Sequence, residues 1–130
     1  MKIAVVTDDH QKISAHFGRA AFYEVFTITD GKITERESLP KPSHDLFASG
    51  PHDEPGTAHG FGPHATDRHM RMLEPIRDCQ VLLSRGMGQG AHDSLEQAGI
   101  HAMVTDIPDI ETAVKAYLEG RLEDHPERLH

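Results

Sequence analysis

The chain has 130 residues, a hydrophobic share of 37% and a formal net charge of -8 at pH 7. Its length suits one compact domain, and its negative charge disfavours binding to nucleic acid phosphates or to an anionic membrane surface, which both need Lys and Arg. No apolar run approaches the roughly 20 residues that span a bilayer, and the first residues turn acidic too soon for a signal peptide, so we expect a cytoplasmic protein.

Three strands are predicted in the first third of the chain. Residues 3–6 form a continuous apolar run with β-branched side chains, which is typical of a buried strand. Residues 22–28 alternate between two faces and predict a second strand, and the dipeptide Asp30-Gly31 after it is a strong signal for a two-residue hairpin turn. The third strand, residues 32–39, is rich in charged side chains, so we expect it at an edge of the sheet.

A long loop is predicted over residues 40–65, where five prolines and four glycines interrupt every regular pattern. Loops of this length are uncommon in a compact domain and are usually functional or disordered. We therefore expect a single domain over residues 1–120 with this Pro/Gly/His-rich loop inside it, followed by a polar tail, residues 121–130, that frays.

Helices and strands alternate in the second half. A helix capped by Thr66 precedes a buried strand at residues 80–84, and a helix ended by Gly99 precedes a strand at residues 101–104. Pro108 opens the last helix. The apolar residues expected on the inward faces of the three helices are Met70, Leu73 and Ile76, then Ala91, Leu95 and Ala98, and finally Ile110, Ala113, Val114, Tyr117 and Leu118.

This order of elements predicts an α/β fold with a mixed five-stranded sheet and helices on both faces. Crossovers between parallel strands are right-handed, which makes strands one, four and five parallel neighbours and leaves the hairpin strands antiparallel on the other side. Ligands of such sheets bind beyond the carboxyl ends of the central strands. We therefore expect the ligand face at the ends of strands one and four.

Two glycine-containing segments are expected to meet at that face. Residues 14–19 follow strand one, and residues 85–90 follow strand four. Glycines let backbone N–H groups approach a ligand, and the helix start after the second segment favours an anion. Arg19 and Arg85 add positive charge, so an anionic cluster or an oxyanion suits this place. The alternative is that the glycines serve only a tight strand-to-helix turn, because one glycine-rich motif is a weak signal.

The same two segments carry a family resemblance. Residues 16–20 (His-Phe-Gly-Arg-Ala) and 86–91 (Gly-Met-Gly-Gln-Gly-Ala) resemble the two signatures of the dinitrogenase iron–molybdenum cofactor biosynthesis family. The resemblance covers nearly the whole chain except residues 40–65. It implies a ribonuclease H-like fold. Members of this family include nitrogenase-cofactor carriers, homologues in organisms without nitrogenase, and the orange protein, which binds a molybdenum–copper sulfide cluster without covalent attachment.

The resemblance implies that the chain binds and carries or stores a metal–sulfur cluster, of the molybdenum–iron or molybdenum–copper type, without catalysing a reaction. It also implies proteins that donate the cluster to this chain and others that accept it. The cysteine triad of fused radical-SAM relatives is absent, since the chain has one cysteine. Carried over by position, the candidate cofactor-binding residues are His16, Phe17, Gly18, Arg19, Arg85, Gly86, Met87, Gly88, Gln89 and Gly90.

Three of these side chains have alternative roles. His16 offers a neutral imidazole to a metal, or else it hydrogen-bonds the loop and positions Phe17 in the core. Met87 is a candidate thioether ligand for copper. The single cysteine, Cys79, precedes the fourth strand, and we expect it to pack in the core, because free cysteines are among the most buried residue types.

Eleven histidines are the most unusual feature of the composition. Histidine-rich tracts bind divalent metals, which suggests a second function, a metal buffer or chaperone for Zn or Ni that works through the loop at residues 40–65. The alternative is that these side chains are hydrophilic filler in a polar loop. The candidate metal ligands are His16, His44, His52, His59 and His64.

A third function is an enzyme. Asp8 and Asp9 near strand one of a ribonuclease H-like sheet suggest a two-metal nuclease. Such a site needs carboxylates from several elements, whereas strand four ends in Arg and Gly. We rank this interpretation below the other two.

Overall fold

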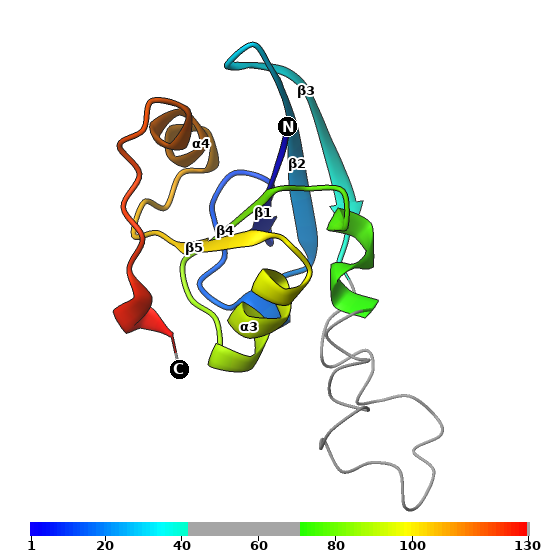
Figure 1. The fold of residues 1–130 in the computed structure, drawn as a ribbon, viewed down its shortest axis with the longest axis vertical. Helices are drawn as coiled ribbons and strands as arrows, with labels where there is room; N and C mark the ends of the chain where they lie inside the picture. The colour runs from blue at the N-terminus through cyan, green and yellow to red at the C-terminus, as the bar shows by residue number, and fades with distance from the viewer. Residues whose placement is uncertain (42–70, 130) are drawn as a thin grey trace, which may run out of the picture.

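The computed structural model describes residues 1–41 and 71–129. Five strands form one sheet in the order β3-β2-β1-β4-β5 (Figure 1). The predicted histidine loop lies outside the described residues, apart from its first two. In chain order the elements are β1 (Lys2–Thr7), the 3-10 turn η1 (Phe17–Arg19), β2 (Phe22–Thr29), β3 (Lys32–Pro40), η2 (Glu74–Ile76), β4 (Val81–Ser84), α3 (Gln89–Gln97), β5 (His101–Val104), α4 (Ile110–Leu118) and η3 (Pro126–Arg128).

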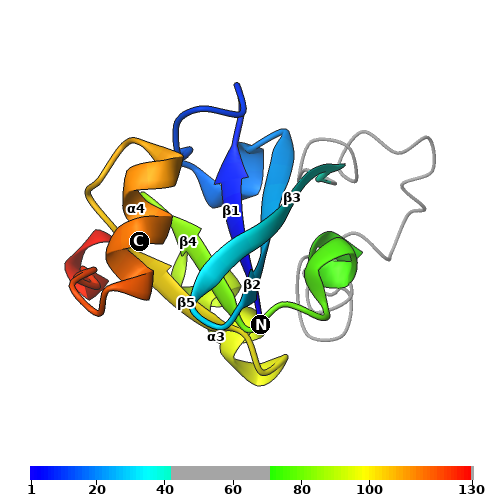
Figure 2. The ribbon, with the colours of Figure 1, turned by 90° about the horizontal axis from the view of Figure 1, so that it is seen from above.

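The sheet is mixed, as predicted. β1 pairs antiparallel with β2 and parallel with β4, and β4 pairs parallel with β5. Figures 1 and 2 show α3 and α4 on opposite sides of the sheet. The strand order, the strand directions and the two helical layers confirm the predicted α/β architecture.

The hairpin between β2 and β3 follows from its turn residues. Asp30 and Gly31 both have positive φ, 54° and 76°, which is the backbone that a two-residue hairpin turn requires. β3 lies at the edge and is exposed along nearly its whole length. Its charged side chains fit that place, since edge strands that carry charge resist pairing with other chains.

The apolar faces agree with the predicted ones, with one difference. Leu73, Ile76 and Leu95 are buried, as are the predicted residues at the start of α4. Ala98 was expected to point inward but is exposed, because α3 ends at Gln97 and Ala98 is its C-cap. Ala91, Tyr117 and Leu118 are half-buried and pack against the core. The predicted helix positions Thr66 and Met70 lie outside the described residues.

The tail was expected to fray, whereas in the structure residues 121–129 lie against the end of β5 and the second motif. The backbone N–H of His125 donates to Val104 O at 2.7 Å, and the Val104 N–H donates to a carboxylate oxygen of Asp124 at 2.9 Å. Leu129 forms a parallel bridge with Met87. These bonds hold the tail along the outer edge of β5, so the folded unit extends past residue 120. In residues 1–41 and 71–129, no helix has the length and apolar character needed to cross a membrane.

A buried hydrogen bond joins β2 to the segment that precedes β4. Tyr23 is fully buried, and its hydroxyl donates to Met72 O at 2.6 Å across 49 residues of sequence. Burial raises the pKa of the Tyr23 phenol, so it stays a donor throughout the neutral range.

We predict that Tyr23→Phe lowers the free energy of unfolding by about 1–2 kcal/mol, because it leaves the buried Met72 carbonyl without a donor. Urea unfolding followed by circular dichroism measures this change. Tyr117→Phe is the matched control, since Tyr117 is half-buried on α4, and we expect a change within about 0.5 kcal/mol. Equal losses in the two variants would contradict the prediction.

Candidate functional site

Two backbone hydrogen bonds join the predicted motifs directly. The Phe17 N–H donates to Gly86 O at 3.0 Å, and the Arg85 N–H donates to Ser14 O at 3.0 Å. Both segments leave the sheet at the carboxyl ends of neighbouring strands, β1 and β4. The predicted meeting of the two motifs is therefore confirmed.

The first motif folds into a short turn around His16. Its carbonyl accepts from the Arg19 and Ala20 N–H groups at 3.0 and 3.1 Å, and its own N–H donates to the Ser14 hydroxyl at 3.1 Å. The backbone of His16 is thus held while its side chain is exposed and makes no hydrogen bond to another described residue. Phe17 lies in the core, 2% exposed, with its ring centroid 6.5 Å from that of Tyr23.

The second motif leads into α3 without a side-chain cap. Gly88 is the N-cap residue, and no side chain accepts a hydrogen bond from the first turn. The start of a helix carries N–H groups without partners and a partial positive charge, which together favour an anion. Gly86, Gly88 and Gly90 all have negative φ, so the backbone conformation of the turn does not itself require glycine. This weakens the tight-turn alternative.

The predicted residues differ in their access to solvent. Those that are exposed are His16, Arg19, Gln89 and Gly90; those that are half-buried are Gly18, Arg85 and Gly88; those that are buried are Phe17, Gly86 and Met87. The side chains of Phe17 and Met87 therefore pack in the core, and for these two residues direct contact with a ligand is limited to the backbone. The expectation that the Met87 thioether faces the site is not met, because Met87 is 1% exposed and bridges to Leu129.

Arg85 is the strongest indication of an anionic ligand. Its Nε is buried and has no hydrogen-bond partner among the described residues. A buried donor without an acceptor is costly, and a carboxylate, oxyanion or sulfide placed at the turn would satisfy it. Arg128 of the tail reaches the same place, with Nη1 3.5 Å from Arg85 O. No sequence pattern pointed to Arg128, because the tail was expected to fray.

A second imidazole lies in the first turn of α3. His92 lies two residues after the glycine turn, its side chain is 23% exposed, and its Nδ1 is buried without a hydrogen-bond partner. The nearest charged group is the Asp93 carboxylate at 3.9 Å. The sequence interpretation passed over His92, although its position two residues after the motif would have placed it beside the turn.

The other candidate metal ligands are not brought to this place. His44, His52, His59 and His64 lie outside the described residues. Asp8 accepts from the Ala21 N–H at 3.0 Å, and Asp9 accepts from the Gln11 and Lys12 N–H groups at 2.9 and 2.8 Å. These bonds hold the loop after β1. Among residues 1–41 and 71–129, no group of three His, Cys, Asp or Glu side chains is arranged to hold a metal ion.

Cys79 packs in the core as predicted. It is 3% exposed, and burial together with the Asp78 carboxylate raises the pKa of its thiol to about 12. A thiol of this kind stays protonated at neutral pH, whereas metals bind the thiolate. Cys79 therefore has a structural role in this conformation.

Lys41 is a buried cation beside the first motif. It is 6% exposed, and its Nζ lies 4.8 Å from the centre of the Phe17 ring and 5.9 Å from that of Tyr23. Burial lowers the pKa of its ammonium to about 8, against the opposing effect of Asp8. The sequence analysis placed Lys41 in a polar loop. No neighbouring residue predicted that its side chain, directly after β3, is buried against the first motif.

The sheet and the joined motifs define the class of this protein. It is a small α/β protein in which two segments are hydrogen-bonded to each other beyond the ends of β1 and β4. One carries an exposed imidazole, and the other carries an arginine with a buried donor and leads into an uncapped helix start. The chain belongs to the dinitrogenase iron-molybdenum cofactor family, whose sequence profile matches residues 1–120.

Two similar proteins align with nearly the whole chain. An uncharacterised protein of Methanocaldococcus jannaschii is 24% identical over 123 residues, which cover 95% of this chain and 90% of that protein. The apo form of the orange protein from Desulfovibrio gigas has a similar structure, with a TM-score of 0.66 and 21% identity over 96% of this chain and 92% of that one. At this level of identity the structural likeness shows a shared fold.

We predict that Lys41→Met raises the free energy of unfolding at pH 7 by up to roughly 3 kcal/mol, the equivalent of moving a pKa from 10.5 to about 8. Below pH 8 the folded state must hold a buried charge. Between pH 8 and 10.5 the folded lysine is neutral while the unfolded one still binds its proton, so the wild-type protein gains stability with pH.

The advantage of Lys41→Met should therefore fade across that window, as measured by urea unfolding at a series of pH values. Lys32→Met, at an exposed position at the start of β3, is the control and should show no such fading. A constant difference between Lys41→Met and the wild type from pH 7 to 10.5 would refute the assignment of a buried charge.

Proposed function

We propose that this protein binds a metal–sulfur cluster of the molybdenum–iron or molybdenum–copper type and carries or stores it without catalysing a reaction. Membership of the dinitrogenase iron-molybdenum cofactor family supports this function. The observation that carries it is the junction of the two motifs, where the buried Nε of Arg85 lacks an acceptor beside an uncapped helix start.

The donor set suits an anionic cluster. The N–H groups at the start of α3 and the guanidinium of Arg85 would hold the negatively charged sulfides, since charge-assisted hydrogen bonds are stronger than neutral ones. The exposed imidazole of His16 would ligate a metal atom. None of these groups forms a covalent bond to sulfide.

The arrangement also suits a carrier better than a permanent holder. One exposed imidazole and a set of backbone donors hold a cluster less tightly than the four thiolates that usually bind an iron–sulfur centre. We propose that donor and acceptor proteins exchange the cluster with this chain in the cytoplasm. The alternative function as a Zn or Ni buffer depends on histidines outside the described residues and stays a prediction.

We predict that anaerobic incubation with tetrathiomolybdate and Cu(I), or with molybdate, iron and sulfide, gives a protein that keeps the metals through gel filtration and shows visible charge-transfer bands. Absorption spectra and metal analysis measure both. Loss of the metals on the column with every mixture, and no bands, would overturn the proposed function.

Substitutions at the two motifs test whether the cluster binds there. His16→Asn and Arg85→Gln should each weaken retention at least tenfold, which corresponds to about 1.4 kcal/mol. His101→Asn is the matched control, since His101 is an exposed histidine at the start of β5, and it should bind as the wild type does. Equal loss in all three variants would place the cluster elsewhere.

A further inference from the structure

The tail after α4 reaches the second motif. Leu129 forms a parallel bridge with Met87, and Figure 1 shows the tail passing the end of β5 on its way to the segment that precedes α3. The Leu129 side chain is half-buried and packs against the core. The family profile matches residues 1–120, so a part of the chain beyond the matched segment makes this contact.

The acidic side chains of the tail are engaged in holding it there. Asp124 accepts from the Val104 N–H at 2.9 Å, and the His125 N–H donates to Val104 O at 2.7 Å. Nδ1 of the His125 ring lies 2.9 Å from a carboxylate oxygen of Glu127 in the turn η3. Because both carboxylates have these partners, neither pairs with Arg128, the last residue of η3.

Arg128 is the cation that this arrangement brings to the second motif. Its side chain is exposed, and Nη1 lies 3.5 Å from Arg85 O, a long distance for a hydrogen bond. Within residues 1–41 and 71–129 it forms no ion pair. The guanidinium is therefore held beside the motif while its other N–H donors stay available to a ligand.

Arg85 supplies the observation that points to a ligand. Its Nε is shielded from solvent and has no hydrogen-bond partner in the described part of the chain. Its backbone N–H, by contrast, donates to Ser14 O at 3.0 Å. The carbonyl that Arg128 approaches belongs to this same residue, so the tail cation lies beside the residue whose side-chain donor lacks an acceptor.

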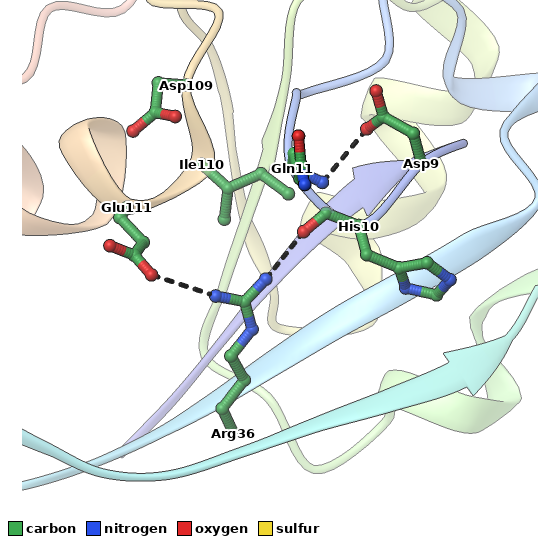
Figure 3. A pocket seen from close by; sticks show the side chains of 7 residues that line it. All are labelled: Asp9, His10, Gln11, Arg36, Asp109, Ile110 and Glu111. Carbon is green, nitrogen blue, oxygen red and sulfur yellow. Dashed lines mark hydrogen bonds and ion pairs between the residues drawn. The ribbon is translucent and has the colours of Figure 1, made fainter.

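Arg36 is the contrasting case, on the α4 side of the sheet. Its Nε donates at 2.8 Å to Glu24, a carboxylate of β2 that is 1% exposed. Figure 3 shows its other two nitrogens directed to Glu111 of α4 and to the carbonyl of His10, at 3.3 and 2.7 Å. The second of these bonds holds His10 at a left-handed φ of 66°. The protein thus supplies acceptors for every nitrogen of Arg36, and it does not do so for Arg85.

We propose that Arg128 is a binding residue of the cluster site and that the tail, residues 121–129, is the arm that positions it. This role rests on the proposed function, because it adds a residue and a ligand charge to that same site. Two guanidiniums donate charge-assisted hydrogen bonds to sulfide. A monoanion neutralises one of them, whereas a dianion neutralises both. The ligand class is therefore a thiometalate with at least two negative charges, or a cluster built from such ions.

Two tetrahedral ions of the same shape test the dependence on charge. Tetrathiomolybdate is a dianion and tetrathioperrhenate is a monoanion. We expect equilibrium dialysis of the full chain at low salt to show tetrathiomolybdate bound about tenfold or more tightly than tetrathioperrhenate. Arg128→Gln should weaken binding of tetrathiomolybdate about tenfold and of tetrathioperrhenate about twofold. Roughly 0.5 M salt should reduce both losses, because it screens an exposed charge.

Arg121→Gln is the matched control. Arg121 is an exposed arginine of the same tail that pairs with Glu119, so its replacement removes the same charge away from the motif, and both ions should bind as they do to the wild type. Equal losses in Arg128→Gln and Arg121→Gln would refute the role of Arg128.

Two further outcomes separate this role from the proposed function. If Arg85→Gln weakens binding of tetrathiomolybdate and Arg128→Gln does not, the role of Arg128 is refuted and the proposed function stands. Binding of neither ion by the wild-type protein also refutes the role of Arg128. The proposed function then fails as well only if the assembled cluster is lost on gel filtration.

Chemical modification gives a readout that does not depend on the folding of a variant. p-Hydroxyphenylglyoxal modifies exposed arginines, and Arg128 and Arg121 are both exposed. Mass mapping of the wild-type protein with saturating tetrathiomolybdate should show Arg128 protected at least about fivefold and Arg121 not protected. Equal modification of Arg128 with and without the ion would contradict its contact with the ligand.

Discussion

The parallel pairing of β1 with β4 is the constraint on which the candidate site depends. Ala4 lies beside Leu82 and Val5 beside Leu83 in the middle of the sheet, and all four are fully buried. Because the two strands run in the same direction, the segments that follow them leave the sheet at the same end. The bonds from Phe17 to Gly86 and from Arg85 to Ser14 follow from that geometry. The motifs are 70 residues apart in the sequence, and the sheet brings them side by side.

The charge of the molecule makes that surface unusual. The chain carries a net charge of -8, yet Arg19, Arg85 and Arg128 lie on the segments that meet at the junction, together with the positive end of the α3 dipole. The positive charge is therefore local. On the opposite face, Glu24 shows the converse arrangement, in which one buried carboxylate is neutralised by its neighbours.

The fold was predictable because its signals are local. The apolar run of β1, the Asp30-Gly31 turn and Gly99 at the end of α3 each act through their own residues and neighbours. The contact between the two motifs was also predictable, because the crossover rule converts the order of elements into neighbouring strands.

The missed features depend on distant partners. Met87 was assigned to the site because it stands between glycines, but its side chain is buried and its backbone bridges to Leu129, 42 residues away. Lys41 looked like a loop residue, and its burial arises from packing against Phe17 and Tyr23. The left-handed backbone of His10 has no signal in a sequence without glycine at that position, because it is held by Arg36, 26 residues away.

The tail along β5 has a consequence for association between molecules. The N–H groups of Ala102 and Val104 donate to the carboxylates of Glu96 and Asp124, both at 2.9 Å, and His125 occupies the Val104 carbonyl. An outer strand with free N–H groups is a template on which another strand can assemble, the first step of aggregation. Here two acidic side chains occupy those donors, while β3 at the other edge relies on its own charges. The two outer strands thus avoid pairing with other molecules by different means. The outward N–H groups of β5 already have acceptors, and β3 carries charged side chains that repel a second strand.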